Sequence, residues 1–168
     1  MELFDAITTR SSAGLLAAPG PSPVELERLL QAAARAPDHG RLRPWRFIVL
    51  EGAARESFAA AAAAAKRRLL PAMTAEQMAG ERDKMLRSPT LVVAACVVDL
   101  ANTKIPEVEQ ILAVGAAVEN LFLAAHALGF GVMWKTGAAA YDAGVKALLG
   151  LQPHDHIAAI LHLGTRLK

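Results

Sequence analysis

Hydrophobic residues recur every three or four positions in several stretches of the chain, a spacing that predicts helices. The clearest example is residues 23–36, where Leu26 and Leu29 lie on one apolar face. Ser22 precedes this helix, and Glu25 follows Ser22 at the spacing of a capping box. The same pattern predicts helices over residues 2–9, 53–70, 74–86, 111–130 and 141–149.

Runs that are apolar at nearly every position predict four strands. They cover residues 47–51, 90–99, 130–136 and 157–164. Because long helices separate these strands, we expect one sheet with helices on both sides. At 168 residues, the chain fits a single domain, residues 1–168, with a sizeable core.

Residues 111–130 are long and apolar enough to be tested as a membrane span. Glu119, Asn120 and His126 interrupt the stretch, and a charge in the middle of a bilayer costs several kcal/mol. We therefore expect no membrane segment, but a helix in the core or shared with another subunit. Small residues on this helix would let a second backbone approach, which favours an oligomer. They are Ala113, Gly115, Ala116 and Ala117.

Composition and charge narrow the class of protein. Hydrophobic residues make up 54% of the chain and charged residues 20%, which excludes a disordered chain. A net charge of +2 gives no broad field for nucleic acid or anionic lipid. The single cysteine, Cys96, lies in an apolar run and is expected to be a buried, inert thiol. The acidic start of the chain does not resemble a signal peptide, so we expect a cytoplasmic protein.

Common catalytic motifs are missing from the sequence. It contains no Cys-x-x-Cys, His-Glu-x-x-His or Gly-x-Ser-x-Gly motif and no phosphate-binding glycine loop followed by lysine and a hydroxyl residue. His154-Asp155-His156 could bind a metal, but no third ligand side chain is indicated, so we expect a surface turn and no metal. If the protein is an enzyme, a cofactor is expected to carry the reaction.

Three short segments carry groups suited to an anionic, planar ligand. Arg10-Ser11-Ser12 places a guanidinium beside two hydroxyls, and arginine can bind phosphate through two N–H groups. The stiff loop over residues 37–44, with Arg35 and His39 near its start, adds donors. Trp134-Lys135-Thr136 ends a predicted strand with an indole, a cation and a hydroxyl. Each segment is also compatible with an ordinary helix end, turn or strand edge.

A nucleic-acid module is a competing interpretation of the second segment. Arg35, Arg41, Arg43 and Arg46 surround Trp45, and basic residues around an aromatic ring are typical of single-strand binding. The rest of the chain has no basic face, so we expect no nucleic-acid partner.

Together, these motifs resemble the nitroreductase family of flavoproteins, in particular its small bacterial members. The resemblance rests on Arg10-Ser11-Ser12, on residues 35–39 with Pro44-Trp45-Arg46-Phe47, and on residues 124–131 with Trp134-Lys135-Thr136-Gly137. A terminal Leu163-Gly164-Thr165 completes the set. The motifs occur in the family's order and span almost the whole chain.

The resemblance implies an α+β fold, a three-layer α/β/α sandwich with a mainly antiparallel sheet, assembled as a homodimer. FMN would bind at the subunit interface and take hydride from NADH or NADPH. It would then reduce a nitroaromatic, a quinone or a related small acceptor in a ping-pong cycle. A non-catalytic flavin-binding sensor or carrier is the alternative.

The resemblance also assigns site residues one by one. FMN would be held by Arg10, Ser11, Ser12, Trp134, Lys135 and Thr136 of one subunit and by Arg35 and His39 of the other. NAD(P)H would contact Ala124, Ala125, His126, Ala127, Leu128 and Gly129. Arg166 or Lys168 would add to the phosphate contacts. No catalytic side chain is expected, because the flavin carries the chemistry.

The sequence departs from the family pattern in three places. Ser11 stands where many relatives have a second basic residue, and Arg43 stands where glutamine often precedes the Pro-Trp pair. The chain is also short, so the segments that cover the substrate pocket are reduced, although residues 68–87 could form part of a lid. These departures affect the expected substrate more than the expected cofactor.

Overall fold

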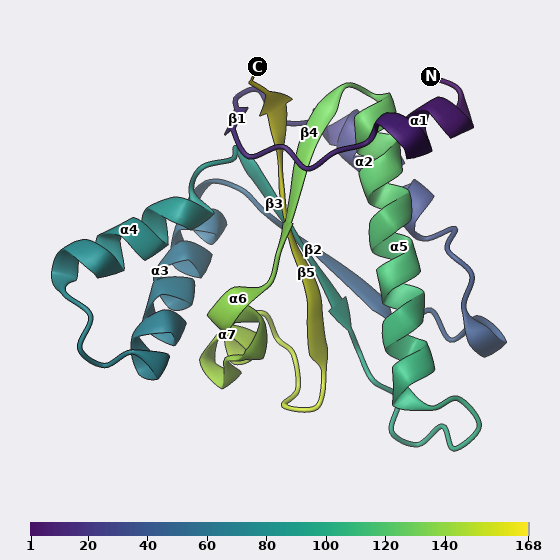
Figure 1. Ribbon diagram of the computed structural model, residues 1–168. Helices are drawn as coiled ribbons and strands as arrows, with labels where there is room; N and C mark the ends of the chain where they lie inside the picture. Colours follow the sequence, from purple (N-terminus) through teal and green to yellow (C-terminus); the bar gives the residue numbers. More distant parts are fainter. Residues whose placement is uncertain (168) are drawn as a thin grey trace.

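The computed structural model describes residues 1–167, which fold into helices on both sides of one sheet (Figure 1). The helices are α1 (Leu3–Thr9), α2 (Pro23–Ala33), α3 (Gly52–Leu69), α4 (Ala75–Met85), α5 (Glu107–Ala127), α6 (Gly137–Tyr141) and α7 (Ala143–Leu148), with a short 3₁₀ helix η1 (His39–Arg41). The strands are β1 (Leu16–Ala17), β2 (Trp45–Leu50), β3 (Thr90–Cys96), β4 (Phe130–Lys135) and β5 (His156–Arg166).

Every strand pair in the sheet is antiparallel. The longest strand, β5, lies between β3 and β4, and β2 pairs with the other edge of β3. The short β1 pairs with the end of β5, where Leu16 lies opposite Arg166. The expected three-layer α+β sandwich with an antiparallel sheet is therefore confirmed.

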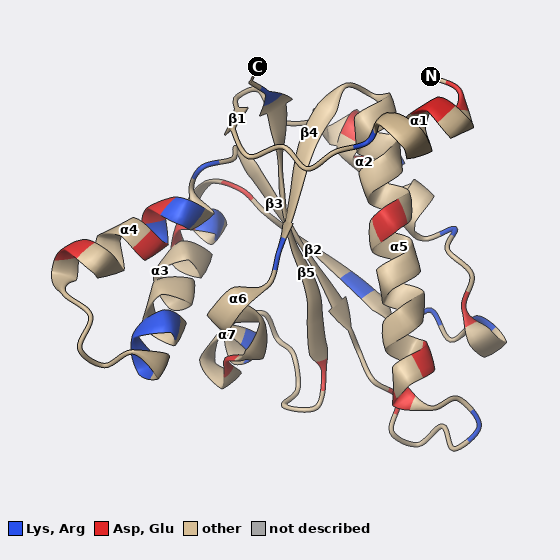
Figure 2. Ribbon diagram, in the orientation of Figure 1, with Lys and Arg blue, Asp and Glu red and all other residues tan. Residues whose placement is uncertain are grey.

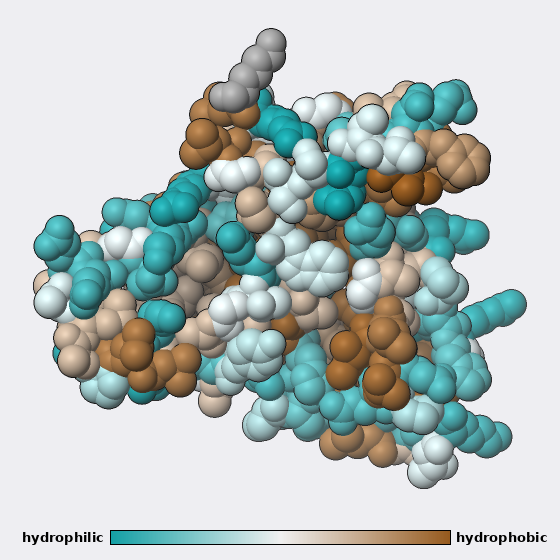
Figure 3. All heavy atoms as spheres, in the orientation of Figure 1, coloured by the Kyte–Doolittle hydropathy of each residue, from teal (hydrophilic) through white to brown (hydrophobic). Residues whose placement is uncertain are grey.

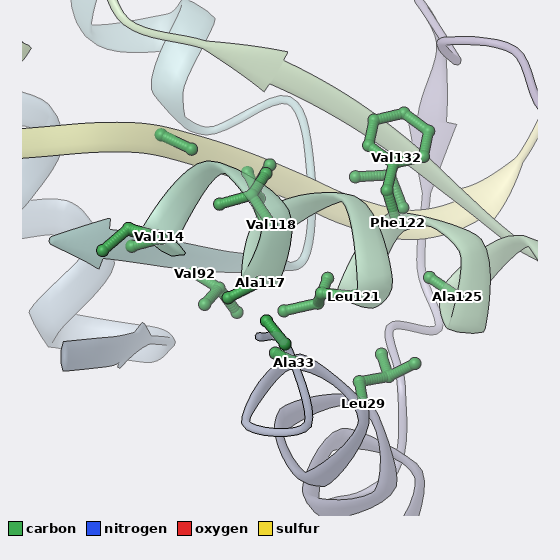
Figure 4. Close-up of a cluster of buried hydrophobic side chains, with 14 of the residues drawn as sticks. Leu29, Ala33, Val92, Val114, Ala117, Val118, Leu121, Phe122, Ala125 and Val132 are labelled. Carbon is green, nitrogen blue, oxygen red and sulfur yellow. The ribbon is translucent and has the colours of Figure 1, made fainter. Parts of the chain in front are cut away.

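One face of the sheet is covered by α5, with α2 packed beside it (Figure 4). Leu29 of α2 and Val118 and Leu121 of α5 are completely buried against Val92 of β3. Because α5 is sandwiched in this way, about 44% of its most apolar stretch is buried, although its length and composition would also fit a membrane span. Its buried face therefore serves as the core of the domain.

The opposite face is covered by α3, α6 and α7, and α4 packs on α3 (Figure 1). Alanines of α3 let this helix lie close to the strands, and Phe58 fills the space between them without any exposed surface. Capping boxes begin α2 and α4, where Ser22 and Thr74 pair with the third residue of each helix.

Some elements differ from the sequence-based expectations. β1 and α6 were not expected, because a two-residue strand and a five-residue helix are too short to show a period. α5 begins at Glu107 rather than 111, directly after Pro106, and the acidic residues of its first turn favour the helix dipole. Of the small residues on α5, Ala113 and Ala117 face the sheet, so only Gly115 and Ala116 are partly open to another subunit.

Candidate functional site

A cleft of about 460 Å³ opens on the α3 side of the sheet, beside β1, the second half of β4 and the middle of β5. This volume lies in the range of small-molecule sites. The walls come from the segment after α1, the end of α4, and β4 with the start of α6. The lining residues are Ala13, Gly14, Leu16, Lys84, Met85, Arg87, Met133, Lys135, Thr136, Gly137 and His162.

The segment after α1 reaches the cleft because it lies directly on β4. The Ala13 amide donates to the Val132 carbonyl oxygen at 2.9 Å. A Cβ at Gly131 would come within 2.5 Å of Leu16 and 2.9 Å of Ala13, so only glycine allows this close approach. Gly131 therefore allows the segment after Ser11 and Ser12 to lie directly on β4, where Ala13 lines the cleft.

β4 and β5 supply the floor of the cleft. Met133 and Lys135 alternate with Trp134 along β4 and face the cleft, and His162 of β5 is paired with Met133. β4 ends where Thr136 and Gly137 turn the chain into α6, and Gly137 has a φ of 64° that favours glycine. These turns bring Lys135 and Thr136 together in the cleft, and their contact with FMN stays a prediction.

The cleft is rich in positive charge. Lys84, Arg87 and Lys135 line it, and Figure 2 shows how the charged residues gather on α4 while α5 is mostly uncharged. Lys84 is paired with Glu81 at 2.5 Å, whereas no ion pair forms with Arg87 or Lys135 within residues 1–167. Such a site suits an anionic ligand with an apolar body.

The predicted phosphate motif is only partly assembled. The Arg166 guanidinium donates to the Ser11 hydroxyl at 2.6 Å, so these two predicted residues lie together. The Arg10 guanidinium instead lies 4.7 Å from the centre of the Phe122 ring and 3.6 Å from the Glu119 carboxylate. Ser12 is exposed, and Lys168 lies outside the described residues. An exposed pair of the Arg10–Glu119 kind contributes little stability, so Arg10 can exchange partners.

Trp134 lies on the opposite side of β4 from Lys135. Its indole N–H donates to the Ala158 carbonyl oxygen at 3.1 Å, and the side chain is 39% exposed. Any contact between Trp134 and a ligand in this cleft would therefore come from its main chain.

Arg35 and His39 lie on the α5 side of the sheet, away from the cleft. His39 Nδ1 is 2.6 Å from the Glu109 carboxylate at the start of α5, and Arg35 borders a groove beside Arg43 and Trp45. The chain does not bring these two residues to its own cleft. This placement is consistent with the expectation that they act on another subunit, which stays a prediction.

The segment predicted to contact NAD(P)H is the last turn of α5. His126 Nε2 is 2.9 Å from the Thr9 hydroxyl, and Ala125 is completely buried in the core. Of the other members, Ala124 and Leu128 are partly buried and pack on the same core, while Ala127 and Gly129 are exposed. A ligand could reach only the exposed part of this segment.

Several cleft residues were not assigned to the site from the sequence. Lys84 lies in the last turn of a surface helix of mixed charge and Arg87 follows that helix, and only the suggestion of a lid over residues 68–87 pointed to them. His162 offered a clearer signal, because it is a polar residue inside an apolar strand. Its pKa is lowered to about 4 by burial, with smaller effects from Lys135 and Arg87.

The other candidate groups do not form a site. His156 is paired with Glu107 at 2.6 Å, and Asp155 accepts the Val98 amide at 3.0 Å, so the two side chains point to different partners. Within residues 1–167, no three metal-binding side chains gather. Cys96 is buried, which raises the pKa of its thiol to about 11.

An antiparallel α+β sandwich with a cation-rich cleft at its sheet edge is the architecture of a small-molecule enzyme or binding protein. Residues 7–165 match the sequence profile of the Nitroreductase family. The chain belongs to this family, and the resemblance seen in its motifs is confirmed.

Two named relatives cover almost the same length. The Escherichia coli (strain K12) protein named "Putative NAD(P)H nitroreductase YdjA" is 35% identical over 167 residues, 98% of this chain and 88% of the relative. A Haemophilus influenzae protein of the same description is 33% identical over 174 residues, 100% of this chain and 90% of the relative.

Solved structures share the fold. A nitroreductase-like protein from Bacillus cereus has a TM-score of 0.84 and 26% identity, covering 100% of this chain and 87% of the other. A protein from Desulfovibrio desulfuricans described as "a putative nitroreductase in complex with fmn" has a TM-score of 0.77 and 23% identity, covering 100% of this chain and 88% of the other.

Proposed function

We propose that this protein is a homodimeric, FMN-dependent oxidoreductase that uses NADH or NADPH to reduce a small acceptor such as a nitroaromatic compound or a quinone. The observation that carries the proposal is the cation-rich cleft beside the end of β4 and the middle of β5. Membership of the Nitroreductase family supports the cofactor, and the names of the relatives support the reductant.

The residues of the cleft fit FMN. Its apolar surface, including Met85 and Met133, suits a flat ring, and the unpaired cations Arg87 and Lys135 suit negative charge. Ser11 and Arg166, already joined, would hold the phosphate together with Arg10 and Ser12. When bound, FMN supplies hydride transfer in two half-reactions, from the nicotinamide to the flavin and from the flavin to the acceptor. Lys84, Arg87 and Lys135 would stabilise the negative charge that reduction places on the ring.

An exposed apolar stripe on α5 supports a dimer. Val108 and Leu112 are 60% and 66% exposed, one turn apart on the side away from the sheet, and the partly open Gly115 and Ala116 continue the stripe. Figure 3 shows brown, apolar areas over α1 and over the lower part of α5. Burying this stripe against a second copy would bring Arg35 and His39 of one protomer toward the cleft of the other.

The first test is the visible spectrum of the purified protein under anaerobic conditions. We expect a yellow protein that releases FMN on denaturation and loses its colour when NADH or NADPH is added. Flavin that neither nucleotide can reduce would indicate the sensor or carrier instead. A colourless, monomeric protein that does not bind added FMN would overturn the proposal.

A matched pair of variants tests the phosphate contacts. Arg10→Ala should weaken FMN binding about tenfold, the loss expected for one charge-assisted hydrogen bond. Arg67→Ala, on the exposed end of α3, removes an equal charge away from the cleft and should leave FMN affinity unchanged. Equal FMN dissociation constants for the two variants would remove Arg10 from the site.

A further inference from the structure

His162 is a buried histidine in the floor of the cleft. It lies in the middle of β5, between Leu91 of β3 and Met133 of β4, and only 5% of its surface is exposed. The neighbouring positions of β5 are filled by leucine and isoleucine. Burying a polar side chain at such a position costs free energy, whereas an apolar residue of similar size would pack equally well.

The hydrogen bonds of Ser88 favour one tautomer of His162. The Ser88 hydroxyl is placed to donate to the Thr90 carbonyl oxygen at 3.2 Å. With that bond made, the same oxygen accepts from His162 Nδ1, 3.0 Å away, and we infer that Nδ1 carries the ring proton. Nε2 is then left as a bare acceptor.

The surroundings keep this imidazole uncharged. Lys135 and Arg87 face the same cleft, and with burial they lower the pKa of His162 to about 4. Lys84 is the third cation of the lining, and its charge is offset by Glu81. His162 is therefore a neutral acceptor surrounded by donors, the one ring of this kind in the cleft lining.

The Ser88 contact explains Nδ1 but leaves Nε2 unused. Within residues 1–167, the side chain of His162 makes one hydrogen bond, which is the bond to Ser88. Nε2 is not one of the buried side-chain atoms that lack a partner, because it is open to the cleft that His162 lines. A ligand that fills the cleft with an N–H or O–H donor could therefore donate to it.

We propose that Nε2 of His162 accepts a hydrogen bond from FMN and so selects for a ligand that presents a donor at this point of the cleft. The inference rests on the proposed function. The donors that FMN offers are the N–H of its ring imide and the hydroxyls of its ribityl chain. His162 thus supplies a neutral acceptor in a site whose other charged groups are donors.

Two substitutions separate the acceptor from the structural link. His162→Gln can place an amide oxygen near the position of Nε2, whereas His162→Met fills similar space without a strong acceptor. Both variants lose the imidazole N–H that Ser88 accepts, so they should fold with similar stability. We expect FMN to bind the Met variant about tenfold more weakly than wild type, and the Gln variant to keep most of the affinity.

Nitrogen-15 NMR of the histidine rings gives a readout that does not depend on activity. In the cofactor-free protein, Nδ1 of His162 should carry the proton, and the Nε2 resonance should shift when FMN is added to saturation. Wild-type protein that binds FMN with no shift at Nε2, or Gln and Met variants with equal FMN dissociation constants, would overturn this inference and leave the proposed function standing. Wild-type protein that binds no FMN would instead overturn the proposed function, and this inference with it.

Discussion

The two faces of the sheet use the same strands but are built for different purposes. On the α5 face, Leu161 and Leu163 of β5 pack into an apolar core that α5 and α2 close. On the other face, the residue between them, His162, borders an open, cation-rich cleft. Alternation along one strand thus places apolar side chains in the core on one side and a residue of the proposed ligand site on the other.

The difference lies in how far the helices extend over each face. α5 has 21 residues and runs along the whole sheet. The side chains that it covers on this face, including those near β4, are apolar. α3, α6 and α7 cover the other face only in part and leave the cleft open beside the end of β4 and the middle of β5 (Figure 1). The polar residues of the cleft lie where these helices do not cover the strands.

The largest expected effect is the loss of stability caused by a substitution in the core on the α5 face of the sheet. Leu121→Ala removes a completely buried side chain of α5 and should lower the free energy of unfolding by about 2–5 kcal/mol. Urea denaturation of the cofactor-free protein measures this change. Leu69→Ala on α3 is the matched control, because Leu69 is 67% exposed and should change stability by less than about 0.5 kcal/mol. Similar losses for both variants would contradict the assignment of the core.

On the face of the sheet that carries the cleft, His162 should make the stability of the protein depend on pH. The histidine is protonated below pH 6.5 in the unfolded chain but only below about pH 4 in the folded one. Between these values the unfolded state binds the extra proton, so stability rises with pH by about 1.4 kcal/mol per unit, or about 3 kcal/mol in all. This stability is complete above pH 6.5 and is lost as the pH falls toward 4.

His162→Gln isolates that contribution, because the other titrating groups are common to both proteins. Urea denaturation at several pH values should give a shallower pH dependence for the variant than for wild type. Parallel curves would mean that His162 titrates normally and is not buried as described.

These contrasts also explain what the sequence could predict. Long helices such as α5 and the apolar strand β3 carry strong periodic or continuous patterns, so they were expected near their observed positions. The side of the sheet on which each residue lies depends on register and on neighbouring helices, which no local pattern contains. Lys135 and Thr136 were found because a motif carries them, whereas Arg87 and His162 come together only through the fold.

The same limit applies to Trp134 and Arg10. Both belong to recognisable motifs, but alternation along β4 turns the indole away from the cleft, and Glu119 with Phe122 draws the guanidinium toward α5. A motif identifies residues near a site, whereas packing determines the direction in which their side chains point.

A smaller effect should distinguish the cations of the open face from charges elsewhere. Lys135→Met removes an unpaired charge from the cleft and should raise the FMN dissociation constant about tenfold, with little change in stability. Lys104→Met, in the exposed loop before α5, is the control and should bind FMN like wild type. Fluorescence titration at two salt concentrations would also show a weaker salt dependence for the Lys135 variant. An unchanged dissociation constant would remove Lys135 from the site.

The smallest expected effect concerns how the open face is held together. The Arg68 guanidinium of α3 donates two hydrogen bonds to Asp142, at 2.7 and 2.5 Å, and Asp142 also caps α7 by accepting the Val145 amide at 2.9 Å. The bonds from Arg68 lower the pKa of the Asp142 carboxyl, so its contribution is present at neutral pH and is lost on acidification through that lowered pKa. Asp142→Ala should destabilise the protein by about 1 kcal/mol, mainly through the lost cap. Arg68→Met keeps the cap, so its loss of unfolding free energy in the same urea measurement should be smaller. A greater loss from Arg68→Met would show that the α3–α7 link, and not the cap, stabilises this side of the domain.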